Sequence, residues 1–131
     1  MTILSPDDVV ALHKKLIAAT GGLAGLRDRG LLESAVMGCY QTFDKQDLYP
    51  TIEEKAARMA FALCKNHPFI DGNKRIAVTS MLVILRMNGI SLSFSQRELA
   101  DLGLGIAAGS VGYEGIVAWI NAHAPRNLLR D

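Results

Sequence analysis

Nine consecutive residues near the middle of the chain combine the side-chain types that phosphate chemistry needs. They read His67-Pro68-Phe69-Ile70-Asp71-Gly72-Asn73-Lys74-Arg75. An imidazole can act as a general base, a carboxylate can hold a hard divalent cation such as Mg²⁺, and two cationic side chains can offset phosphate charge. These residues lead into a helix-forming stretch, and the free backbone N–H groups of a helix's first turn attract anions. The residue types therefore predict a phosphate site.

Ordinary turn chemistry is the alternative explanation of the same residues. Asp71-Gly72-Asn73 is a common turn sequence, and a histidine at the end of a helix often only complements the helix dipole. Lys74 and Arg75 argue against this alternative. They are cations at the positive end of a helix, where they are locally unfavourable unless an anion binds beside them.

Two strongly patterned helices flank the nine residues. The stretch 52–66 has apolar residues at helical spacing and ends before Pro68, because a residue that precedes proline is pushed out of the helical region. The stretch 73–88 is apolar on nearly every side, which is typical of a helix in the middle of a fold. Gly89 then provides a left-handed cap.

The rest of the chain predicts an all-α domain. Capping residues and apolar periodicity indicate further helices from Ser5 to before Thr20, over 30–37, from Ser95 to Ala108 and over 113–124. Residues 38–51 have no clear period, and this segment is about as long as loops become before function or disorder is the usual explanation. The prediction is a single domain over residues 1–131, a compact bundle of about six helices with the 73–88 helix at its centre.

The composition excludes several classes of protein. The 131 residues include 14 Lys+Arg and 13 Asp+Glu, so the formal charge is +1, and half of the residues are hydrophobic. Direct nucleic-acid binding by phosphate neutralisation needs a basic excess that this chain lacks. No apolar run is long enough to span a membrane, and the N-terminus lacks the pattern of a signal peptide, so we expect a cytoplasmic protein without membrane contact.

Cysteine and histidine spacing predicts neither disulfides nor a zinc site. Cys39 and Cys64 are the only cysteines, and they lie in different segments, as expected of two reduced thiols. His13, His67 and His123 are scattered without the short spacing of zinc ligands. We expect His13 and His123 to be surface or capping residues, because neither has an obvious partner in the sequence.

The nine residues resemble the signature of the Fic/Doc family, His-Pro-Phe-x-Asp/Glu-Gly-Asn-Gly/Lys-Arg, and match it at every defined position. We call residues 67–75 the signature segment. Residues 25–35 and 48–57 are also similar to Doc-type, death-on-curing proteins. The small size of the chain resembles Doc toxins rather than the larger Fic proteins, and the resemblance implies the Fic/Doc fold.

The resemblance implies a role for each signature residue. His67 would be the general base that takes the proton of a target hydroxyl, and Phe69 would anchor the segment in the core. Asp71 would hold Mg²⁺, and Gly72 and Asn73 would form the anion hole. Lys74 and Arg75 would bind nucleotide phosphates.

Lys74 bears on which phosphate of ATP is attacked. Adenylylating members of the family have glycine at this position, whereas Doc-type proteins with lysine are phosphotransferases that hold ATP the other way round. The resemblance therefore implies transfer of the γ-phosphate of ATP. The alternatives are a nucleotidyltransferase that places AMP or UMP on a hydroxyl, and a catalytically silent domain that binds only a nucleotide or an antitoxin.

The resemblance also implies partners. The target of Doc toxins is a threonine of elongation factor Tu, whose modification arrests translation, and the expected antitoxin is a Phd-like protein that covers an apolar groove by the active site. Residues 38–51 would be the family's flap, which pairs with an extended target segment, or else a plain surface loop. Ser110, Glu114 and Gly115 fit a self-inhibitory pattern of the family, in which the glutamate pairs with the signature arginine, but the start of the last helix also explains them.

Overall fold

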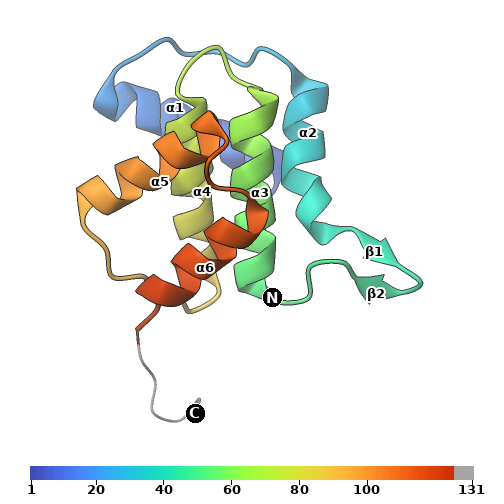
Figure 1. The fold of residues 1–131 in the computed structure, drawn as a ribbon. Coiled ribbons are helices and arrows are strands. Elements are labelled where there is room, and N and C mark those ends of the chain that lie inside the picture. The colour runs from blue at the N-terminus through green and yellow to red at the C-terminus, as the bar shows by residue number, and fades with distance from the viewer. Residues whose placement is uncertain (126–131) are drawn as a thin grey trace.

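The computed structural model describes residues 1–125 and is mostly helical (Figure 1). The described helices are α1 (Pro6–Thr20), α2 (Arg29–Met37), α3 (Ile52–Asn66), α4 (Asn73–Met87), α5 (Gln96–Ala108) and α6 (Tyr113–His123). A 3-10 turn over Gly38–Tyr40 and a two-stranded hairpin of β1 (Thr42–Phe43) and β2 (Gln46–Asp47) join α2 to α3. The predicted all-α fold with six helices is confirmed.

Helices α3 and α4 lie side by side in the middle of the bundle, and the other helices surround them (Figure 1). Their facing side chains, such as Met59, Leu63, Ile76 and Ile84, are fully buried. The outer face of α4 is less buried than its sequence predicts. Thr79, Leu82, Val83 and Arg86 on that face line a groove of about 380 Å³ together with residues 90–92 and Phe94.

Local signals fix where the helices begin and end. Ser5, Thr51 and Ser95 each accept a backbone N–H bond three residues on, and an acidic side chain at that third position bonds back to the cap. Helix α3 ends at Asn66, and the cap residue His67 adopts the left-handed conformation just before Pro68. No helix in residues 1–125 has both the length and the apolar run that a membrane span requires.

The hairpin lies far from the signature segment, so the expectation that residues 38–51 form a flap there is wrong. Lys55, in the first turn of α3, is buried, and its ammonium group binds the Asp47 carboxylate at 3.0 Å and the Tyr49 carbonyl. These contacts hold the hairpin at the N-terminal end of α3, whereas His67 follows its C-terminal end (Figure 1). The 15 residues of α3 separate the two by about 22 Å at 1.5 Å per residue.

His123 joins the end of α6 to the start of α5. Its Nδ1 lies 2.7 Å from the Trp119 carbonyl and its Nε2 lies 2.8 Å from the Glu98 carboxylate, while its ring stacks on Trp119. Both partners can only accept, so the ring satisfies both when it is a doubly protonated imidazolium. The contact with the last-turn carbonyl is that of a capping residue, as expected, but the partner Glu98 is not evident from the sequence.

These contacts shift both pKa values in the direction that favours the ion pair. The Trp119 carbonyl and then Glu98 raise the pKa of His123 above its usual 6.5. The backbone N–H of Ser95 and then the His123 ring lower the pKa of Glu98 from 4.5 to about 2. The His123 contribution is therefore present below pH 6.5 and is lost as the pH rises through the raised pKa. The Glu98 contribution is present above pH 4.5 and is lost as the pH falls towards 2.

We predict that Glu98→Gln lowers the melting temperature most between pH 4.5 and 6.5, where both contributions are present. The difference from the unmodified protein should shrink towards pH 9, because the His123 ring loses its charge as the pH rises through its raised pKa. Thermal unfolding followed by circular dichroism across this range measures the effect, with Asp101→Asn on the same helix as the control. An equal loss at pH 5.5 and pH 9 would contradict the ionic contribution.

Candidate active site at the start of helix α4

His67 projects from the turn that links α3 to the signature segment. Its backbone is left-handed, with φ 48° and ψ 56°, and its side chain is exposed. The side chain of Arg27 stabilises this turn, because its Nε donates to the His67 carbonyl at 2.7 Å and its Nη2 donates to the Asn66 carbonyl at 2.9 Å. Arg27 thereby satisfies two of the carbonyls that the end of α3 leaves without an intrahelical partner.

Residues 25–28, which connect α1 to α2, pair with the signature segment in a strand-like manner. The Pro68 carbonyl accepts from the backbone N–H groups of Arg27 at 2.7 Å and Asp28 at 3.0 Å, and the Ile70 N–H donates to the Gly25 carbonyl at 3.0 Å. This pairing is not predicted by the sequence, because it joins residues about 40 positions apart. The one local signal is the cluster Gly21, Gly22 and Gly25, all of which adopt positive φ.

The Asn73 side chain stabilises the loop of the signature segment by hydrogen bonds to its backbone. Its Oδ1 accepts the Phe69 N–H at 3.0 Å, and its Nδ2 donates to the Phe69 carbonyl at 3.0 Å. The Phe69 ring is 2% exposed, so the prediction that it anchors the segment in the core is confirmed. Asn73 Nδ2 also lies 3.4 Å from His67 Nδ1, a long contact in which the His67 nitrogen must accept.

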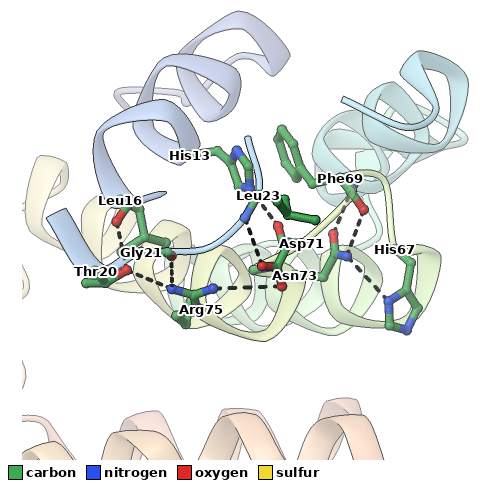
Figure 2. Close-up of polar contacts among 11 residues, drawn as sticks. His13, Leu16, Thr20, Gly21, Leu23, His67, Phe69, Asp71, Asn73 and Arg75 are labelled. Carbon is green, nitrogen blue, oxygen red and sulfur yellow. Dashed lines mark hydrogen bonds and ion pairs between the residues drawn. The ribbon is translucent and has the colours of Figure 1, made fainter. Parts of the chain in front are cut away.

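Asp71 presents a partly exposed carboxylate at the middle of the site (Figure 2). Its Oδ2 accepts the Leu23 N–H at 3.0 Å and its Oδ1 accepts the Gly72 N–H at 2.8 Å. The Leu23 and Gly72 bonds, with a smaller contribution from Arg75, lower the pKa of the carboxyl group below its usual value. Asp71 is therefore ionised at neutral pH.

Gly72 and the first turn of α4 form an open cradle. Gly72 adopts the left-handed conformation with φ 77°, and a Cβ at this position would lie 3.1 Å from the Ile17 side chain. The backbone N–H groups of Asn73, Lys74 and Arg75 have no acceptor among residues 1–125. Free N–H groups at a helix N-terminus favour anions, so this cradle is a candidate anion-binding site.

The two signature cations occupy different settings. The Lys74 side chain is exposed and makes no hydrogen bond or ion pair within residues 1–125. Arg75 Nη1 donates to the Thr20 hydroxyl at 2.7 Å and to the Gly21 carbonyl at 2.8 Å, and its Nη2 lies 3.9 Å from the Asp71 carboxylate (Figure 2). Both cations line a groove of about 440 Å³ between α1, α4 and α5.

The prediction that His13 is a surface or capping residue is wrong. It is 2% exposed, its ring stacks on Phe69 at 3.8 Å, and its Nε2 lies 2.8 Å from the Asp71 carbonyl. This contact cannot be predicted from the sequence, because Asp71 lies 58 positions away from His13 on another element.

The structure brings the predicted residues together at one place. Figure 2 shows His67 at one end and Arg75 at the other, with Asn73 and Asp71 between them. A family model described as the Fic/DOC family matches residues 3–85, which include this whole arrangement.

The chain belongs to the Fic/DOC family. The protein named "Protein kinase doc" of Escherichia phage P1 is 36% identical over 116 residues, which cover 88% of this chain and 90% of that protein. A second relative, "Toxin Doc" of Mycolicibacterium smegmatis, is 40% identical over 75 residues, 57% of this chain and 58% of that protein. The resemblance drawn from the signature segment is confirmed.

The Fic/DOC self-inhibitory pattern has no contact to support it in residues 1–125. Glu114 is exposed in the first turn of α6, and no hydrogen bond or ion pair joins it to Arg75. Ser110 donates its hydroxyl to the Gly105 carbonyl at 3.2 Å, within the end of α5.

We predict that Arg27→Ala increases hydrogen exchange at the Phe69 and Ile70 amides about fivefold, because loss of about 1 kcal/mol of hydrogen bonding makes local opening that much more frequent. Mass spectrometry or NMR measures the exchange. Arg29→Ala is the matched control, since Arg29 pairs with Asp7 and Glu33 at the surface and does not contact the signature segment. Equal exchange in the two variants would show that the Arg27 side chain does not hold this turn.

Proposed function

We propose that this protein is a Doc-like toxin that transfers the γ-phosphate of ATP to a threonine hydroxyl of a protein target. One observation carries the proposal. A base, His67, and a carboxylate, Asp71, flank a helix N-terminus (Figure 2). The first backbone N–H groups of that helix and the Lys74 ammonium have no acceptor among residues 1–125, so they are available to a phosphate. Catalysis of phosphoryl transfer consists mainly of such positioning and charge stabilisation.

The residues present fit a nucleotide with Mg²⁺. The Asp71 carboxylate is 43% exposed and ionised, and each of its oxygens retains a lone pair beyond the N–H bond it accepts. No group of three or more His, Cys, Asp or Glu side chains suited to a metal occurs in residues 1–125, and Mg²⁺ beside ATP needs only one or two protein carboxylates. Bound there, Mg²⁺ would offset charge on the phosphate oxygens.

The proposed transfer assigns one task to each residue. The exposed His67 ring accepts the proton of the target hydroxyl, since its 3.4 Å contact with Asn73 is weak enough to be displaced. The hydroxyl oxygen forms a bond with the γ-phosphorus, and the bond from phosphorus to the bridging oxygen breaks, so that ADP leaves with the electron pair. Lys74, Arg75 and the free N–H groups of α4 stabilise the charge on the phosphoryl group.

Two facts favour phosphoryl transfer over the alternative nucleotidyl transfer. Lys74 occupies the position at which adenylylating members of the family have glycine. The phage P1 relative, which this chain matches over nearly its whole length, is named a protein kinase. A domain that only binds is less well supported, because the base and the carboxylate are both present.

The proposed partners follow from the similarity of this chain to Doc toxins. We expect elongation factor Tu in the cytoplasm as the target, with arrest of translation as the result. A Phd-like antitoxin would cover the groove between α1, α4 and α5, whose walls include the apolar side chains of Leu16, Val78 and Leu99 beside Lys74 and Arg75. An amphipathic segment fits such a groove.

We predict that the purified protein, freed of antitoxin and supplied with Mg²⁺, labels elongation factor Tu from γ-labelled ATP and not from α-labelled ATP. His67→Ala should abolish the labelling with the helical circular dichroism unchanged, because only the base is lost. Asp71→Ala should abolish the normal response to Mg²⁺. Label from the α-phosphate alone would make the protein a nucleotidyltransferase, and no label on any protein of a whole lysate would leave only a binding domain.

We predict that Lys74→Gly lowers γ-phosphoryl transfer at least tenfold, because a cation that meets the transferring phosphate is removed. Label from the α-phosphate in this variant would show that Lys74 excludes nucleotidyl transfer. Lys65→Gly is the matched control, since Lys65 is an exposed lysine near the end of α3 that contacts Phe61 and no signature residue. Unchanged γ-transfer in the Lys74 variant would show that Lys74 does not determine the reaction.

A further inference from the structure

One face of α1 contacts four residues of the signature segment. His13, Ile17 and Thr20 lie at positions i, i+4 and i+7, so they share a side of the helix. His13 contacts the Asp71 carbonyl, and Thr20 accepts from Arg75 (Figure 2). Ile17, between them on the helix, packs against Gly72. Helix α1 is thus a wall of the site, although it contributes none of the signature residues.

His13 is the buried polar member of this face. Its side chain is 2% exposed. Burial of a polar ring nitrogen costs free energy unless the nitrogen forms a hydrogen bond. Because a carbonyl can only accept, Nε2 donates its proton to the Asp71 oxygen 2.8 Å away. The His13 ring stacks on the Phe69 ring, with the two centroids 3.8 Å apart and the planes 9° from parallel. His13 therefore also holds Phe69, the residue that anchors the loop in the core. An apolar side chain would serve for packing alone, whereas this position provides a donor.

The hydrogen bond from His13 holds the peptide group between Asp71 and Gly72, and this same peptide group also binds the Asp71 carboxylate. The Asp71 carbonyl and the Gly72 N–H belong to one planar peptide group. His13 holds the carbonyl side of this plane, and the Gly72 N–H on its other side donates to Asp71 Oδ1 at 2.8 Å. If the plane turned, the Gly72 N–H would leave the carboxylate and the cradle at the start of α4 would change shape.

We propose that His13 is a positioning residue for Asp71, which it orients by donating Nε2–H to the peptide group between Asp71 and Gly72. The inference rests on the proposed function for its effect on catalysis, but its effect on the loop is independent of that function. Groups of this kind that orient a metal-binding carboxylate typically change metal affinity or activity by 10- to 100-fold when they are removed.

Three substitutions separate the hydrogen bond from the packing. His13→Phe keeps a ring against Phe69 and removes the donor. His13→Gln keeps a donor on a chain of similar reach and removes the ring, and His13→Met matches the glutamine in length without a donor. Because Gln and Met differ at one group, that pair tests the hydrogen bond even if the Phe variant does not fold.

The first measurement needs no ligand. We expect the Gly72 amide to exchange with solvent severalfold faster in the Phe and Met variants than in the original protein, and the Gln variant to retain slow exchange. Equal exchange in the Gln and Met variants would overturn the proposal, because the donor would then have no effect on the peptide group.

The second measurement is the kinetics of phosphoryl transfer. The Met variant should show a kcat roughly tenfold below that of the Gln variant and a higher Mg²⁺ concentration for half-maximal rate, with the KM for the protein target unchanged. Equal kinetics in these two variants would overturn the catalytic part of the proposal. If the original protein transfers no phosphate, the proposed function fails, and the amide exchange alone decides the role of His13.

Discussion

The geometry of the site depends on the Asn73 carboxamide, which bonds to both backbone groups of Phe69. This interaction folds the signature segment back on the first residue of α4, so the loop closes without using the backbone N–H groups of that helix. A loop that closed through those N–H groups would leave none for a ligand. The cradle is therefore open because a side chain, and not the helix backbone, satisfies the turn.

Contacts from outside the signature complete this arrangement. Residues 25–28 pair with one edge of the loop, the Arg27 side chain binds the carbonyls at the end of α3, and one face of α1 packs on the other side. The loop is held on several sides, which suits the proposed task of positioning phosphate and a hydroxyl with little reorganisation. The same contacts explain why Gly22 and Gly72 are needed: a Cβ on Gly22 would lie 2.6 Å from the Asp71 carboxylate.

The sequence predicts the parts of this molecule that local signals determine. Helix α3 begins and ends where expected because Thr51 caps it and Pro68 ends it, and α4 begins at Asn73 as expected because Gly72 precedes it. The roles of His13 and residues 25–28 could not be predicted, since hydrogen bonds between residues 40 to 58 positions apart leave no periodicity. The family resemblance predicts a flap over residues 38–51, but the antiparallel packing of α2 and α3 places this segment at the end of α3 that lies away from the signature segment (Figure 1).

The central claim, that the N-terminus of α4 is the phosphate site, is tested most directly by NMR. Backbone amide shifts of the antitoxin-free protein would be followed while ATP and Mg²⁺ are added, with His67→Ala as a variant that lacks the base but keeps the cradle. We expect the largest shifts at Asn73, Lys74 and Arg75 in both proteins. Shifts concentrated elsewhere, with these three amides unchanged, would contradict the central claim.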